Sequence, residues 1–214
     1  MWNGILAAAV SVMQIAAVLF IENKYEEQKK ENKTGKRWLV YSIISVLTVV
    51  LNMQLFRQES YSPLMLLNFV AISTVVLTTG VIDFYCHKIP NLVLAIGAGS
   101  RVFLLLMTLF FERPEFLTQL LMSLAGCIAS LLVMLLISIV SKQGIGYGDV
   151  KMYACIGLYL GIMDTYYILF YAVLLAALYA AYVLLAKKGD RKTRIPFGPF
   201  THLGFVLVYL FSFM

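Results

Sequence analysis

The fold class is decided by the stretch FLTQLLMSLAGCIASLLVMLLISIV, residues 116–140, which contains no Asp, Glu, Lys or Arg. A helix needs about 20 mostly apolar residues to cross the hydrocarbon core of a bilayer. This stretch is long enough to span a membrane with some tilt. The sequence therefore predicts a membrane-spanning helix here.

Seven more apolar stretches flank this one on both sides. They predict an all-α, polytopic membrane protein of about eight transmembrane helices, divided into an N-terminal helix pair with a charged loop (residues 1–63) and a main membrane domain (residues 64–214). One of them, Met152–Met163, is too short to cross a bilayer unaided. The seven are Gly4–Ile21, Trp38–Phe56, Leu64–Ile82, Leu92–Phe111, Met152–Met163, Tyr166–Ala186 and Phe200–Met214.

The composition agrees with lipid as the solvent. Of the 214 residues, 61% are hydrophobic and only 13% are charged, whereas soluble domains carry about 25% charged residues. The net charge of +6 comes from Lys and Arg that lie between apolar stretches. Positive charge in that position is typical of cytoplasmic loops, so the sequence indicates a lipid surface as partner and not a nucleic acid. The three cysteines form no CxxC pair, and no metal site is expected.

The distribution of Lys and Arg predicts the orientation of the chain. Alternate loops, at residues 22–37, 83–91, 141–151 and 187–199, hold fourteen of the seventeen, and the opposite loops hold only Arg57 and Arg113. By the positive-inside rule the charged loops face the cytoplasm and both termini lie outside. We therefore expect a multi-pass protein of the cytoplasmic membrane.

Two acidic residues lie at ends of predicted spans on the same cytoplasmic side. Asp83 follows an apolar run, and Asp149 follows the glycine-rich segment Gly144-Ile-Gly146-Tyr-Gly148. Acidic groups at membrane depth are costly and usually functional. Glycine allows positive φ and close backbone approach, and a helix over residues 149–163 would be only about 22 Å long. We expect the turn before it to be drawn into the membrane beside Asp149.

Three motifs resemble those of the prepilin peptidases, the GxGD aspartyl proteases that remove the leaders of type IV prepilins. Gly146-Tyr-Gly148-Asp149-Val-Lys151 is similar to the family's GxGDxK signature. Asp83 stands six residues before Ile89-Pro90-Asn91, as in the second aspartate motif. Ile195-Pro-Phe-Gly-Pro-Phe200 is similar to an element near the C-terminus of many members. The resemblance covers roughly residues 65–212.

The resemblance implies a GxGD intramembrane aspartyl protease fold with Asp83 and Asp149 as the catalytic pair. It implies that prepilins or pseudopilins are cut at the cytoplasmic membrane face, without cofactor. Motif residues expected to contact substrate are Pro90, Asn91, Gly146, Gly148, Lys151, Pro196 and Gly198. Bifunctional members carry a long loop with two CxxC pairs and methylate the product. Residues 22–37 contain no cysteine, so we expect peptidase activity only.

The sequence leaves two other functions and the role of Arg101 undecided. The chain could be another GxGD protease, of the preflagellin or signal-peptide peptidase type, or a small transporter that uses the two aspartates as a proton or cation site. Arg101 interrupts a predicted span, where a charge normally has a partner. That partner could be a catalytic carboxylate or a structural acceptor, or the span could be shifted so that Arg101 lies at a shallower depth.

Overall fold

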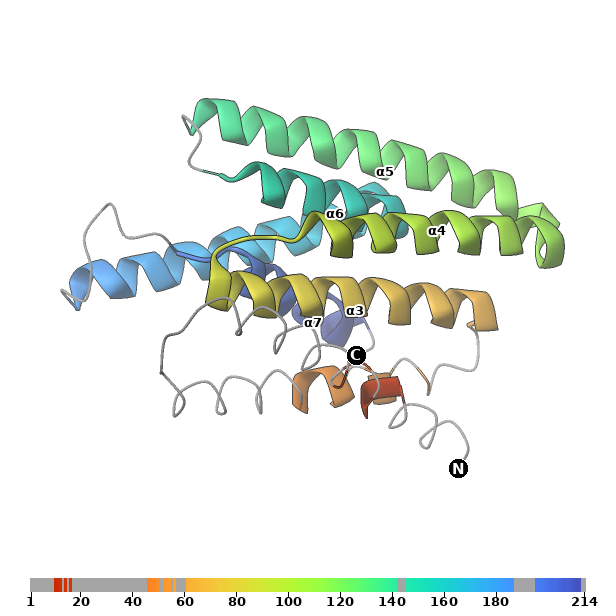
Figure 1. Cartoon of the computed structure of the whole chain (residues 1–214), viewed down its shortest axis with the longest axis horizontal. Helices are drawn as coiled ribbons and strands as arrows, with labels where there is room; N and C mark the ends of the chain where they lie inside the picture. Colours follow the sequence, from red (N-terminus) through yellow and green to blue (C-terminus); the bar gives the residue numbers. More distant parts are fainter. Residues whose placement is uncertain are drawn as a thin grey trace.

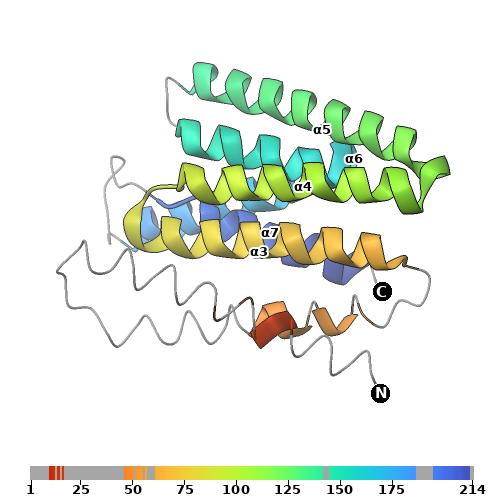
Figure 2. The ribbon, with the colours of Figure 1, turned by 45° about the vertical axis from the view of Figure 1, so that its right-hand side comes forward.

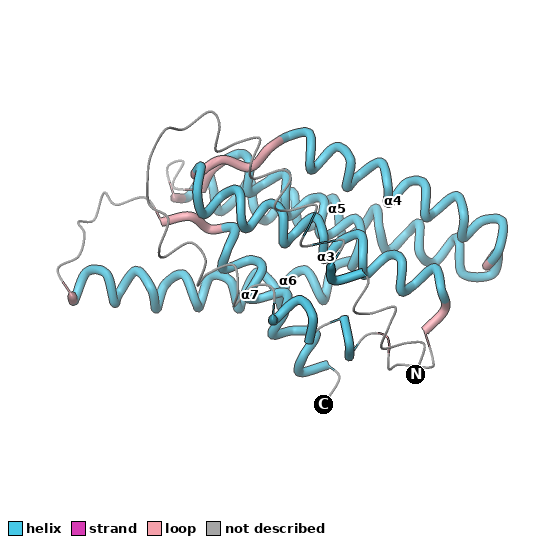
Figure 3. The backbone as a smooth tube through the Cα atoms, turned by 60° about the horizontal axis from the view of Figure 1, so that its bottom comes forward, coloured by secondary structure: helices cyan, strands magenta, loops and turns pink. Residues whose placement is uncertain are grey.

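The computed structural model describes residues 10–12, 14, 16, 46–50, 52–54, 56, 61–141, 145–186 and 195–212. Its long elements are all helices (Figures 1 and 3): α3 (Pro63–Cys86), α4 (Asn91–Phe111), α5 (Arg113–Val140), α6 (Tyr147–Leu185) and α7 (Gly198–Ser212). The predicted all-α membrane architecture is confirmed. The charged loops at 22–37 and 187–194, Gly144, and most of the first two predicted spans lie outside the described residues.

Local sequence signals set the ends of α3. The side chain of Ser62 accepts a hydrogen bond from Met65 N at 3.2 Å, and Pro63 occupies the first turn, where its missing N–H is not needed. At the other end His87 takes the left-handed conformation with φ 51° and its N–H bonds to Asp83 O. Pro90 then stands at the N-cap of α4, because proline cannot continue a helix.

Four of these helices, α3, α4, α5 and α6, are long and apolar enough to cross a membrane. On α5 the large apolar side chains Leu117, Leu121, Ile128, Leu132 and Leu136 are exposed. Its buried face instead carries mostly small residues, which are Ser123, Gly126, Ser130 and Ser138, together with Met134. A helix that turns its small residues inward and its large apolar residues outward is typical of packing in lipid.

The predicted segments Met152–Met163 and Tyr166–Ala186 are the two arms of one bent element, α6, so the described residues from 61 onward form five helices where six were predicted. The bend is at Gly161, whose φ of 75° and ψ of −163° are not helical and are accessible mainly to glycine. Figures 1 and 2 show that the second arm of α6 runs back toward the end where α3 finishes. The bend therefore replaces the loop that was expected between two spans.

The polar pair Asp164-Thr165 made a loop plausible, but each side chain forms a hydrogen bond within the fold. Tyr209 Oη donates to Asp164 Oδ2 at 3.1 Å, and Thr165 Oγ1 donates to Gly161 O at 2.6 Å. Helix α6 can therefore resume directly after the bend.

Helices α5 and α6 approach so closely that their backbones touch. A Cβ at Gly126 would collide with Gly157 O and lie 2.6 Å from Gly161 Cα, and a Cβ at Gly157 would collide with Gly126 O and Ser130 Oγ. Glycine at such positions lets two helices pack without intervening side chains. The contact lies beside the Gly161 bend and holds it against α5.

Arg101 is the buried hub of the bundle, with 3% of its surface exposed. Nε donates to Leu158 O at 3.1 Å, Nη1 to Asn68 Oδ1 at 2.7 Å and Nη2 to Ser123 Oγ at 2.7 Å. Arg101 thus links α4 to α3, α5 and α6 through neutral acceptors. Of the two partners that the sequence left open, the structural one is correct.

The described residues of the N-terminal region are bonded to α3 by buried amides. Gln14 Nε2 donates to Ser73 Oγ at 2.8 Å and to Thr74 Oγ1 at 2.9 Å. Asn52 Nδ2 donates to Ser11 Oγ and to Gln14 Oε1, both at 2.9 Å. Such bonds favour association of helices in lipid. The division into residues 1–63 and 64–214 stays a prediction.

Candidate active site

Asp83 lies in the last turn of α3 and is 7% exposed. Its Oδ2 accepts a hydrogen bond of 2.8 Å from the backbone N–H of Gly198, the first residue of α7. The first N–H groups of a helix have no partner within it, so Asp83 satisfies one of them from a different element. A carboxylate is held at this depth because a helix N-terminus favours negative charge.

Close packing of glycines makes that bond possible. A Cβ at Gly198 would lie 2.9 Å from Asp83 Cβ and 3.1 Å from Gly80 Cα. A Cβ at Gly80, one turn before Asp83, would lie 3.1 Å from Gly198 O. Helices α3 and α7 therefore cross at two glycines, and a side chain at either would push the N–H away from the carboxylate.

Asp149 lies in the first turn of α6, where the helix N-terminus favours an anion. Gly146 is the N-cap, and its carbonyl accepts the N–H of Asp149 at 3.0 Å. Asp149 Oδ1 is buried and has no hydrogen-bond partner among the described residues. The site thus holds a second carboxylate with a free acceptor oxygen.

The expectation of a glycine turn with positive φ is wrong for Gly146 and Gly148. Gly146 has φ −71° and ψ 147°, an extended conformation open to any residue, and α6 begins at Tyr147, so Gly148 is helical. Of these two glycines, only Gly148 is closely approached by another segment of the chain, at Ile89. A Cβ at Gly148 would lie 3.2 Å from Ile89 Cβ.

The three sequence motifs meet at one end of the bundle. The GxGDxK segment packs on the IPN segment through Gly148 and Ile89, and Lys151 Nζ donates to Asn91 Oδ1 at 3.1 Å. The third motif reaches Asp83 through Gly198. Asp83 and Asp149 are close enough for the charge of one to act on the other. The end of α3 and the starts of α6 and α7 thus bring a pair of carboxyl groups together.

Two more of the residues predicted to contact substrate lie beside helix starts. Pro90 is the N-cap of α4, and Pro196 is half-buried just before α7. Nothing in the described part of the chain groups three His, Cys, Asp or Glu side chains for a metal ion.

The sequence analysis did not predict Tyr153 as part of the candidate site. Tyr153 is fully buried one turn after Asp149, its ring centroid lies 6.0 Å from that of Phe197, and its Oη lies 3.2 Å from Thr201 Oγ1 in a hydrogen bond. Tyr153 therefore joins the start of α6 to the start of α7. The spacing of four residues from Asp149 places both on one helix face and was the available signal.

The chain matches the type IV leader peptidase family over residues 69–181, somewhat more than half of its length. It is 34% identical over 89 residues to the prepilin leader peptidase/N-methyltransferase of Bacillus subtilis (strain 168), an alignment that covers 42% of this chain and 36% of the relative. It is 34% identical over 71 residues to the protein of the same name from Xanthomonas campestris pv. campestris, covering 33% of this chain and 25% of the relative.

The chain thus aligns with about a third or less of each curated relative's length. No solved structure matches it. The family match contains both aspartates and two of the three motifs whose contacts enclose them. The chain belongs to the type IV leader peptidase family.

Proposed function

We propose that the protein is a membrane aspartyl endopeptidase that cuts the leader from type IV prepilins or pseudopilins at the cytoplasmic membrane face. The observation that carries the proposal is the meeting of the three motifs around Asp83 and Asp149. Both aspartates lie where loops predicted to be cytoplasmic begin or end. A leader that precedes an apolar helix would reach them from that side.

The chemistry needs one ionised and one protonated carboxyl group. Two neighbouring carboxylates do not both ionise easily, so the pair shares one proton. The ionised member takes a proton from water as the water oxygen attacks the scissile carbonyl carbon. The protonated member donates to the carbonyl oxygen. When the C–N bond breaks, the leaving nitrogen takes the proton from the carboxyl group that had received it from water. The other carboxylate takes back a proton from a hydroxyl of the gem-diol, so that the pair again holds one shared proton.

The contacts of the two carboxyl groups are consistent with one ionised and one protonated member. Asp83 Oδ2 is held by Gly198 N–H, which fixes the orientation of the carboxyl group. Asp149 Oδ1 is unpartnered among the described residues. Asn91 and Lys151, bonded to each other, stand beside the pair and are proposed to contact the leader with Pro90, Pro196 and the motif glycines.

Cleavage of a prepilin by the purified protein tests this function. The detergent-solubilised protein is incubated with a prepilin, and the products are identified by mass spectrometry. We expect a single cut at the junction of leader and apolar helix. Intact substrate, together with proton or cation flux in liposomes, would instead favour a transporter.

Gly148→Ala should slow cleavage by about tenfold or more, and Gly146→Ala should leave it close to wild type. A Cβ at residue 148 would meet Ile89 at 3.2 Å, so the start of α6 must shift, whereas a Cβ at residue 146 makes an ordinary contact of 3.4 Å. A displacement of about 1 Å can cost on the order of a hundredfold in rate.

The measurement is the cleavage rate and melting temperature of both variants. Equal rates in the two would show that the contact with Ile89 does not position Asp149.

A further inference from the structure

A cavity of about 280 Å³ lies at the end of the bundle away from the two aspartates. It is bordered by Phe69 near the start of α3, fourteen residues and about 20 Å of helix before Asp83. Glu115 in the first turn of α5 also borders it. The cavity is therefore separate from the candidate active site.

Arg101 lies in the cavity wall, but the fold already uses its charge. Its three bonds go to Asn68, Leu158 and Ser123, and its guanidinium carbon lies 5.8 Å from the ring centroid of Tyr159. Among the described residues no carboxylate forms an ion pair with it. Arg101 is thus a fixed positive charge that holds the wall together.

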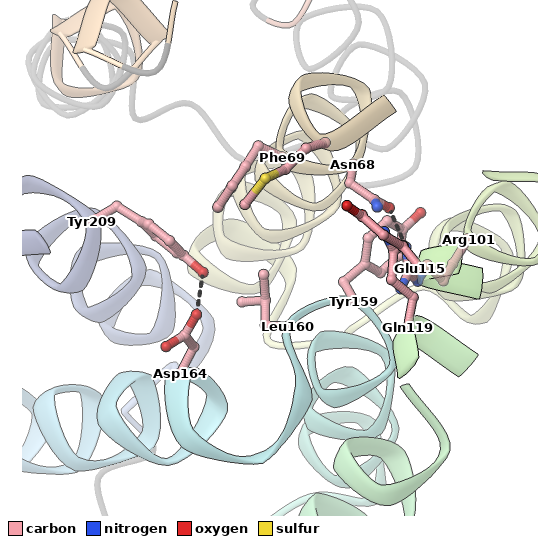
Figure 4. Close-up of a pocket in the computed structure, with 10 residues that line it drawn as sticks. Asn68, Phe69, Arg101, Glu115, Gln119, Tyr159, Leu160, Asp164 and Tyr209 are labelled. Atoms are coloured by element: carbon pink, nitrogen blue, oxygen red, sulfur yellow. Dashed lines mark hydrogen bonds between the residues drawn. The ribbon is translucent and has the colours of Figure 1, made fainter. Parts of the chain in front are cut away.

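The groups left to receive a ligand are acceptors. Gln119 Oε1 is buried without a hydrogen-bond partner in the described structure, although Gln119 Nε2 donates to Glu115 Oε2 at 3.4 Å. Across the cavity Asp164 accepts one bond, from Tyr209 Oη at 3.1 Å (Figure 4). Figure 4 places the Asp164–Tyr209 pair on one side and Gln119 with Glu115 on the other. A ligand with several N–H donors would complete both sides.

The formal net charge of the residues that line the cavity favours a positively charged ligand. Glu115 and Asp164 carry −2 and Arg101 carries +1, which leaves a formal −1. One positive charge neutralises it, whereas an anion would add repulsion from both carboxylates. The rings of Phe69 and Tyr209 also border the cavity, and aromatic faces attract organic cations.

We propose that this cavity binds a primary ammonium group, such as the headgroup of an aminophospholipid or a free alkylamine. The ammonium supplies three N–H donors and one positive charge, and Glu115, Gln119 Oε1 and Asp164 in the lining can accept such donors. Glu115 lies in the first turn of a membrane-spanning helix, so the cavity borders the depth at which lipid headgroups lie.

The test is a thermal unfolding titration of the full chain in detergent. The probes are short-chain phosphatidylethanolamine, short-chain phosphatidylcholine with its N–H donors methylated, and free ethanolamine. A ligand of the folded state raises the melting temperature with its concentration. We expect phosphatidylethanolamine to stabilise and phosphatidylcholine to have little effect. Stabilisation by ethanolamine as well would support the site with free amines as a second source.

Asp164→Asn should weaken the apparent affinity for phosphatidylethanolamine about tenfold or more, because it removes the charge yet keeps an acceptor for Tyr209. Glu112→Gln is the matched control, since it removes a carboxylate at the corner of α4 and α5 that does not line the cavity. If Asp164→Asn does not fold, the exposed Glu115→Gln carries the same expectation. Equal stabilisation by the two lipids, or no difference between the cavity variants and the control, would overturn the proposal.

Discussion

Asp149→Asn should reduce prepilin cleavage by about a thousandfold or more, and Asp83→Asn should do the same. An amide can neither take a proton from water nor share one with the opposite carboxyl group. Residues that act as a unit lose most of the rate when either is removed, so the double variant should be little worse than each single one.

Both variants should stay folded. Asparagine at residue 83 can still accept the N–H of Gly198 with its Oδ1, so the crossing of α3 and α7 is retained. Glu112→Gln, a carboxylate-to-amide change outside the site, should keep wild-type activity. The measurement is the single-turnover rate beside the melting temperature of each protein. Retention of most activity in Asp83→Asn or Asp149→Asn would exclude the paired mechanism.

Gly157→Ala should lower the melting temperature by about 10 °C, and Gly126→Ala by a similar amount. The new methyl group in each would collide with backbone atoms of the facing helix, which cannot rotate aside as a side chain can. Overpacking a close contact costs about 1–3 kcal/mol and occasionally more, and 1 kcal/mol corresponds to roughly 2–4 °C for a chain of this size.

The control for these two variants is Gly99→Ala. Gly99 lies inside α4, and a Cβ added there would meet no atom of another helix within 4 Å. Alanine is the better helix former by about 1 kcal/mol, so this variant should be neutral or slightly stabilising. Since Gly126 and Gly157 share one contact, the double variant should cost less than the sum of the two. Melting temperatures of Gly126→Ala and Gly157→Ala that match Gly99→Ala would show that the helices can separate at no cost.

The sequence predicted the elements whose signal is continuous along the chain. The apolar runs from Leu64 to Val140 placed α3, α4 and α5 to within a few residues, because a bilayer imposes a minimum length on each span. The break between the two arms of α6 was predicted at Asp164-Thr165, because hydropathy responds to this polar pair, and it lies at Gly161. Hydropathy does not register one glycine whose φ is positive.

The candidate site was predicted as a set of motifs but not as a set of contacts. Asp83, Asp149 and Gly198 could be selected from their resemblance to the family motifs. The support of Gly148 by Ile89, or of Tyr153 by Thr201, joins residues 59 and 48 positions apart. Such pairs depend on how the helices cross. Arg101 was recognisable as an anomaly, but its three neutral acceptors come from three other helices.

The hydrogen bond from Gly198 to Asp83 also orders events during synthesis. Residues 83 and 198 are 115 positions apart, so the ribosome completes α3, α4, α5 and both arms of α6 before the N–H that holds Asp83 exists. Until α7 inserts, a nascent chain carries both aspartates but cannot fix the first of them. Co-translational insertion therefore delays the fully assembled carboxyl pair until the rest of the bundle has been made.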